Sequence, residues 1–170
     1  GDEIITSPWT MCATATSILH WNAIPIFADI DEETFCISPE KIKECLSPKT
    51  KAVLGVDIFG QSANYEEIRK VVPDHVKIIC DTAQAPGALR NGKFAGTFGD
   101  IGGFSFNYHK HIHTGEGGLI VTNNDELAER CRLIRNHAEA VIDSRPNLPI
   151  NNMIGYNFRM GEIEAAIAKC

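Results

Sequence analysis

One lysine stands among three histidines in the second half of the sequence. The segment reads Ser105-Phe106-Asn107-Tyr108-His109-Lys110-His111-Ile112-His113-Thr114-Gly115-Glu116-Gly117-Gly118. An expected strand ends near Ser105, and Lys110 follows it in a Gly-rich stretch that permits close backbone approach. Neighbouring imidazoles and partial burial both lower the pKa of an amine and make it a better nucleophile. The segment therefore indicates a reactive lysine, whereas a lysine without such neighbours would be interpreted as a solvated surface residue.

The same three histidines allow a second interpretation. His109, His111 and His113 alternate, so on an extended strand their imidazoles would share one face. Imidazoles on one face of a strand can bind a metal ion. The alternative is that these side chains line a substrate entrance or tune the lysine.

A second polar cluster, Asp81-Thr82-Ala83-Gln84, directly follows the apolar run of residues 76–80. In an open α/β sheet, ligands bind beyond the carboxyl ends of the strands. An acid at such a position is partly desolvated and needs a partner. Asp81 is therefore either a ligand-binding group or a cap of the following turn, and the motif alone leaves both open.

The elements that position these clusters alternate along the chain. We expect strands over residues 3–6, 24–28, 51–56, 77–80, 101–106 and 118–122, and helices over 12–21, 38–46, 65–72, 124–137 and 161–170. Asn123 is expected to cap the fourth helix in a capping box with Glu126. Residues 143–152 resemble a long loop, and Trp21, Phe27 and Phe104 are expected in the core. This alternation predicts an α/β fold with a mostly parallel sheet.

Composition limits the function classes. The 170 residues suit about one domain of roughly 100–200 residues. An apolar fraction of 44% disfavours a disordered chain. A net charge of −6 disfavours nucleic acid and anionic membranes as binding partners. No apolar run reaches about 18 residues, so no membrane span is expected. Six scattered cysteines suggest buried, reduced thiols and a cytoplasmic location.

Four motifs in order carry a family resemblance. Residues 99–106 with Lys110 and residues 115–118 closely resemble the lysine-bearing segment of DegT-type sugar aminotransferases. These are pyridoxal-phosphate enzymes of the aspartate aminotransferase fold. Residues 81–88 resemble the strand end that binds the pyridine ring in that family. Residues 26–31 and 155–160 match as well, and the resemblance runs in register from residue 1 to residue 170.

The resemblance implies roles for individual residues. Lys110 matches the amine that forms a Schiff base with pyridoxal phosphate, and Asp81 matches the carboxylate that keeps the pyridine nitrogen protonated. Gln84 matches a residue near the ring and its phenolic oxygen. Ser105 matches a phosphate-binding hydroxyl. Asn157 matches a residue that reaches the phosphate of the neighbouring subunit's cofactor, which implies a homodimer with a shared active site.

The resemblance also places two residues against the pyridine face. The family usually has a stacking aromatic residue where this sequence has Met11, and Trp9 stands two residues earlier. Either side chain could cover the ring. The implied fold is the three-layer α/β/α large domain, incomplete at both ends. A Gly-Thr phosphate loop is expected before Gly1 and a small domain after Cys170, so the chain resembles part of a longer enzyme.

The implied activity is transfer of an amino group from an amino acid such as glutamate to a nucleotide-linked keto sugar, in amino-sugar or cell-surface polysaccharide biosynthesis. Lys110 would hold the cofactor and then move a proton as general base and acid. Some relatives carry histidine in place of the lysine and act as dehydratases, so the retained lysine favours transamination. The alternatives are a non-catalytic regulatory or binding protein and a metal-dependent enzyme. Because the family resemblance accounts for Lys110 in the histidine-containing segment, no metal ion is expected there.

Overall fold

A six-stranded sheet forms the centre of the molecule. The structure is a computed structural model that describes residues 1–139 and 153–170. Its strands are β1 (Glu3–Thr6), β2 (Ile24–Phe27), β3 (Thr50–Val56), β4 (Lys77–Asp81), β7 (Ile101–Ser105) and β8 (Gly118–Val121). Their order is β2-β1-β3-β4-β7-β8, and every neighbouring pair is parallel except β7 with β8. The predicted α/β fold with a mostly parallel sheet is confirmed.

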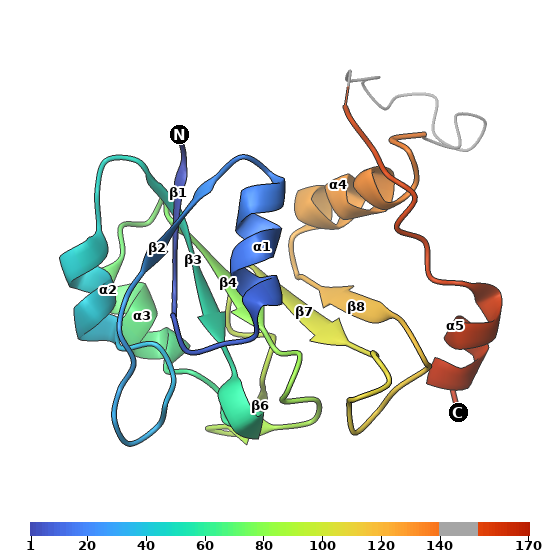
Figure 1. Ribbon diagram of the computed structural model, residues 1–170, viewed down its shortest axis with the longest axis horizontal. Helices are drawn as coiled ribbons and strands as arrows, with labels where there is room; N and C mark the ends of the chain where they lie inside the picture. The colour runs from blue at the N-terminus through green and yellow to red at the C-terminus, as the bar shows by residue number, and fades with distance from the viewer. Residues whose placement is uncertain (140–152) are drawn as a thin grey trace.

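Among the described residues, five α-helices accompany the sheet, of which the first three connect strands and the last two follow the final strand (Figure 1). They are α1 (Cys12–His20), α2 (Pro39–Cys45), α3 (Tyr65–Val71), α4 (Asp125–Arg135) and α5 (Glu162–Ala168). The crossover through α1 moves along the sheet in one direction, whereas the crossovers through α2 and α3 move in the other. Because such crossovers are right-handed, α1 lies on one face, and α2 and α3 pack together on the opposite face.

The reversal of direction creates a switch point between β1 and β3. The chain leaves β1 toward β2, and it leaves β3 toward β4, so the two connections diverge at the carboxyl ends of neighbouring strands. This is where open α/β sheets bind ligands, because a crevice forms between the diverging loops. The loop from residue 7 to residue 11 and the short 3-10 helix η1 (Ile58–Gly60) border it.

Local sequence explains most helix boundaries. The Ser38 hydroxyl accepts the backbone N–H of Lys41 at 3.4 Å, and Pro39 follows as the first helical residue of α2. The predicted cap of α4 is wrong by one residue. Asn124, not Asn123, accepts the N–H of Leu127 at 3.0 Å. The third helical position is therefore Leu127, and the predicted capping box with Glu126 does not form.

The core lies mainly between β3, β4 and the helices of the α2–α3 face. Every residue of β3 except Lys51 is buried. The prediction that Trp21 and Phe27 belong to the core is wrong, since they are 50% and 51% exposed. Phe27 belongs to the edge strand β2, in which no residue is buried. Trp21 follows α1, and its ring packs against His20 and Tyr156.

Two smaller features also differ from expectation, and one prediction falls outside the described residues. The two-stranded sheet of β5 (Leu89–Arg90) and β6 (Lys93–Phe94) was not predicted, because two-residue strands have no periodicity. Only two of the six cysteines, Cys36 and Cys80, are buried, although all six are free thiols. The loop predicted over residues 143–152 lies outside the described residues. Within residues 1–139 and 153–170, no helix has the length and apolar character needed to cross a membrane.

Candidate active site

Asp81 is the last residue of β4, at the carboxyl edge of the sheet. Its Oδ2 accepts the Thr14 hydroxyl of α1 at 2.8 Å, and its Oδ1 accepts the backbone N–H of Ala83 at 3.2 Å. The contact with Ala83 confirms the turn-cap interpretation, and the ligand-binding interpretation stays a prediction. Asp81 does cap the turn that follows its strand, but a second element also holds its carboxylate. The group remains half-buried, with lone pairs left for a ligand.

Gln84 follows three residues later, and it is oriented by the loop after β3. Its Oε1 accepts the backbone N–H of Phe59 at 2.7 Å. Phe59 has a left-handed backbone, with φ of 56°, and its side chain is 69% exposed. A non-glycine residue in that region costs conformational energy and is often found at functional sites. Because the amide oxygen is engaged, the NH₂ group of Gln84 is the part available to a ligand.

Lys110 lies in a loop that follows β7, the strand beside β4. Asp81 pairs with Gly103 in the register of the two strands, so the loop leaves the sheet on the same edge as the carboxylate. The backbone N–H of Lys110 donates to the carbonyl of Asn107 at 2.9 Å, which closes a turn. Within the described part of the chain, the half-buried Lys110 amine makes no hydrogen bond or ion pair. No described side chain therefore competes with a ligand for this amine.

The loop that carries Lys110 is held by its own side chains. The Asn107 amide donates to both carboxylate oxygens of Glu116, at 2.9 and 3.0 Å, and the buried Thr114 hydroxyl donates to the carbonyl of Glu116 at 2.8 Å. The Ser105 hydroxyl, at the end of β7, accepts the N–H of Asn107 at 3.3 Å. These hydrogen bonds hold the two ends of the loop together, and Lys110 lies between them in the sequence.

The three histidines do not share one strand face. Residues 106–117 form turns and bends instead of the extended strand on which the metal interpretation depended. The His109 ring lies 3.8 Å from the ring of Tyr108, centroid to centroid, while His111 and His113 are exposed. Among residues 1–139 and 153–170, no three His, Cys, Asp or Glu side chains gather as a metal site.

Trp9 and Met11 both lie at the start of α1, beside the Thr14 that holds Asp81. Met11 is the N-cap residue and is 65% exposed. The Trp9 ring packs 6.2 Å from the ring of Phe35, and Phe35 in turn lies 6.3 Å from Phe59. Both candidates for covering the pyridine face thus lie near the edge of the sheet that carries Asp81, and their role stays a prediction.

Asn157 is not part of this cluster. Its neighbours Tyr156 and Phe158 pack against the ring of His20, at the far end of α1. Thr14, which contacts Asp81, lies six residues earlier, or about 9 Å along the helix axis at 1.5 Å per residue. The backbone of Asn157 instead bridges to Asn136.

Sequence reasoning missed Asp57. This residue follows β3 directly and is completely buried. It accepts the N–H of Ala63 at 2.9 Å and the Thr82 hydroxyl at 2.7 Å. Burial raises its pKa, because the charged form loses its hydration. The sequence carried the same signal as for Asp81, an acid directly after an apolar run.

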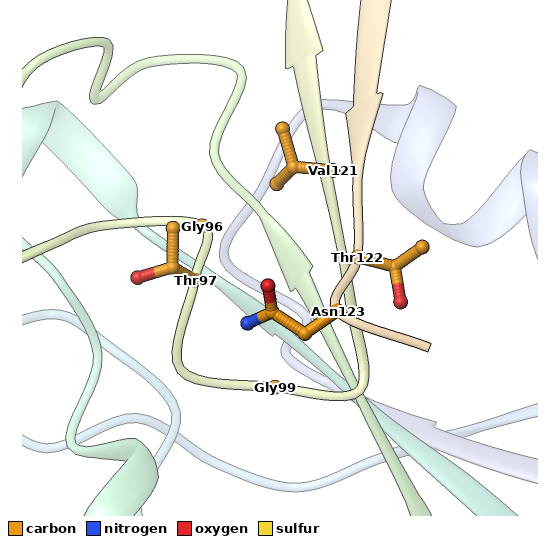
Figure 2. A pocket seen from close by; sticks show the side chains of 6 residues that line it. All are labelled: Gly96, Thr97, Gly99, Val121, Thr122 and Asn123. Carbon is orange, nitrogen blue, oxygen red and sulfur yellow. The ribbon is translucent and has the colours of Figure 1, made fainter. Parts of the chain in front are cut away.

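A small cavity lies on the opposite edge of the sheet and contains none of these residues (Figure 2). Its volume is about 70 Å³, and it is lined by Gly96, Thr97, Gly99, Val121, Thr122 and Asn123. Gly99 precedes β7, and Thr122 follows the antiparallel β8, so both mark the amino edge. This space suits a few water molecules and not a cofactor.

The fold and its polar edge define an α/β domain with a lysine and a carboxylate beyond neighbouring parallel strands. Residues 1–170 match the DegT/DnrJ/EryC1/StrS aminotransferase family, and the chain belongs to that family.

Three similar proteins illustrate the match. The pleiotropic regulatory protein of Geobacillus stearothermophilus is 43% identical over 169 residues, which are 98% of this chain and 44% of that protein. The GDP-perosamine synthase of Vibrio cholerae is 37% identical over 168 residues, covering 98% of this chain and 45% of the synthase. The solved structure of an aminotransferase from Psychrobacter cryohalolentis has a TM-score of 0.92 at 32% identity, covering 99% of this chain and 45% of that one. The chain therefore spans less than half the length of these relatives.

Proposed function

We propose that this chain is part of the cofactor-binding large domain of a pyridoxal-phosphate-dependent sugar aminotransferase. The observation that carries the proposal is the position of two groups, the Lys110 amine, which has no partner among the described residues, and the oriented Asp81 carboxylate. They lie beyond two adjacent parallel strands, on one edge of the sheet. Family membership supports the same activity. The chain matches less than half of these relatives' length, which supports a longer protein. A phosphate loop before this segment and a small domain after it are part of the proposal.

The residues present fit the cofactor of this family. Pyridoxal phosphate, when bound, supplies a protonated pyridine ring that withdraws electrons from the reacting carbon. Asp81 would hold the proton at the ring nitrogen, since its carboxylate is oriented and keeps free lone pairs. Gln84 would donate its NH₂ to the phenolic oxygen, and the Ser105 hydroxyl would bind the phosphate. Lys110 would bond covalently to the cofactor.

Lys110 also has a second task in the proposed reaction. Lys110 Nζ would take a proton from the carbon that bears the amino group, and would return one, as general base and acid. Met11 or Trp9 would cover the ring and exclude water from its face. Asn157, remote from Asp81 in its own chain, would serve the phosphate of a partner subunit, which supports a homodimer.

The proposed substrates are an amino acid, of which glutamate is the first candidate, and a nucleotide-linked keto sugar. The GDP-perosamine synthase relative supports a sugar joined to a nucleotide. We also place the protein in the cytoplasm, because its six cysteines are all free.

The test is to trap the cofactor on the full-length protein with borohydride and to map the modified peptide. Wild type is expected to carry the adduct on Lys110, and Lys110→Ala is expected to carry none. Lys51→Ala, which removes an exposed lysine from β3, is the control and is expected to keep the full yield. An undiminished yield in Lys110→Ala would overturn the assignment.

A regulatory protein without catalysis is the second candidate, because the relative from Geobacillus stearothermophilus bears a regulatory name. The two functions differ in one spectroscopic property. An aminotransferase is expected to show a visible absorption band that shifts when an amino donor is added, and a non-catalytic protein is not.

A further inference from the structure

We propose that Thr14 is a positioning residue for Asp81, and that Thr10 completes a chain of hydroxyl groups that holds the carboxylate toward the cofactor. The inference rests on the proposed function, because it assigns these two threonines to the same site.

The direction of the chain follows from hydrogen-bond chemistry. Thr14 Oγ1 lies 2.8 Å from Asp81 Oδ2 and 2.8 Å from Thr10 Oγ1. An ionised carboxylate can only accept, so the single hydrogen of Thr14 points to Asp81. Thr14 must then accept from Thr10. The chain therefore runs from Thr10 through Thr14 to Asp81, and each hydroxyl donates once.

Burial strengthens the hydrogen bond from Thr14 to Asp81. Thr14 is only 4% exposed, so water does not compete for its hydroxyl. Hydrogen bonds to a charged acceptor are about twice as strong as neutral ones. The Ala83 N–H holds the other carboxylate oxygen, so α1 and the turn after β4 fix Asp81 from two sides.

A neighbouring acid engages the other hydroxyl donor at this edge of the sheet. Asp57 directly follows the adjacent strand β3, and its backbone N–H donates to the carbonyl of Asp81 at 2.9 Å. Thr82 donates to Asp57 and cannot also serve Asp81. The Thr14 hydroxyl is thus the side-chain donor on the described residues that stabilises the charge of Asp81.

The experiment measures pyridoxal phosphate binding to the full-length apoprotein by fluorescence titration. Thr14→Val keeps the shape of the side chain and removes the hydroxyl. Its dissociation constant is expected to rise about tenfold to a hundredfold, as for a lost hydrogen bond to a charged group. Thr14→Ser keeps the hydroxyl and is expected to stay within about threefold of wild type.

The matched control is Thr16→Val on the same helix. The Thr16 hydroxyl bonds only to backbone carbonyls of α1, at 3.0 and 3.2 Å, so affinity is expected to be unchanged. Melting temperatures separate binding from folding. If Thr14→Val does not fold, Thr10→Val decides, with an expected loss of about threefold to tenfold.

The outcomes are distinct. If wild type binds while Thr14→Val binds equally well, or while Thr14→Ser loses as much as Thr14→Val, this role is wrong and the proposed function stands. A Thr10→Val variant with wild-type affinity would overturn the chain of hydroxyls. A wild-type protein that does not bind pyridoxal phosphate would overturn both.

Discussion

Asp57 and Asp81 lie at the carboxyl ends of neighbouring parallel strands, Asp57 just after β3 and Asp81 as the last residue of β4, yet their surroundings give them different properties. Asp81 is half-buried and keeps lone pairs for a ligand. Asp57 is completely buried, and both of its side-chain oxygens are engaged within the protein. A buried carboxylate of this kind joins two loops, since Ala63 precedes α3 and Thr82 follows β4. Asp57 therefore stabilises the edge on which Gln84 and Asp81 lie.

The raised pKa of Asp57 predicts a pH dependence of stability. Because burial raises this pKa in the folded state, the folded protein holds the Asp57 proton more tightly than the unfolded chain does. The stability from this group is complete below the unfolded pKa of about 3.9, and it is lost as pH rises through the folded pKa. Asp57→Asn cannot ionise and keeps an oxygen acceptor for the Ala63 N–H.

Relative to wild type, Asp57→Asn is expected to gain free energy of unfolding as pH rises from about 4, up to the raised pKa. Urea unfolding of the full-length protein at several pH values between 4 and 7 measures the difference. A difference that is constant over this range, or that falls with pH, would contradict the assignment of burial as the cause.

At the scale of single elements, α4 depends on its first residues. It follows β8, contains no buried residue and lies away from the centre of the sheet (Figure 1). With little packing to stabilise it, its stability depends on the cap, the acidic first turn of Asp125 and Glu126, and the basic last turn.

The structure therefore predicts that alanine substitution destabilises α4 at one of two adjacent asparagines and has little effect at the other. Asn124→Ala removes the acceptor for the Leu127 N–H and is expected to destabilise α4 by about 1 kcal/mol. Asn123→Ala is expected to change its stability by less than about 0.5 kcal/mol. Amide hydrogen exchange within residues 127–135 measures both variants. Faster exchange in Asn123→Ala than in Asn124→Ala would show that the helix begins one residue earlier.

On the scale of the whole molecule, the apolar surface is unevenly distributed. The region of β8 and α5 exposes large apolar side chains, namely Leu119, Ile120, Ile154, Phe158, Ile163 and Ile167. Within the described residues, β8 has no strand on its outer side. Large exposed apolar patches and open strand edges are typical of surfaces that another part of a protein covers. This agrees with a chain that spans less than half the length of its relatives.

Residues 1–170 expressed alone are accordingly expected to associate and to bind pyridoxal phosphate weakly. The phosphate is a dianion that needs several donors to replace its water. Among the described residues, the family resemblance offers only Ser105 and a partner's Asn157 as phosphate-binding groups. Light scattering and a cofactor titration, with the full-length protein as control, measure both properties. A stable dimer of the segment with stoichiometric, micromolar binding would contradict this prediction.

The amino-acid sequence by itself determined the alternation of strands and helices and the two strand ends that carry chemistry. These features are local. Apolar runs predict the buried strands, Ser38-Pro39 predicts the start of α2, and an acid or a lysine directly after a strand is visible without a partner. The family motifs around Asp81 and Lys110 are equally local, which is why the fold and the family were predicted before the structure.

Only the tertiary structure decided which groups meet. Thr14 reaches Asp81 across 67 residues, and this contact exists because α1 covers one face of a sheet in which β1 and β4 flank β3. The hydrophobic periodicity of the sequence does not predict the order of the strands in the sheet. The edge position of β2 exposed Phe27, and residues 106–117 form turns and bends, not the extended strand that the metal interpretation required. Partners distant in sequence determine these outcomes, because packing and hydrogen bonding depend on distance in space, whereas helix and strand signals depend only on neighbours along the chain.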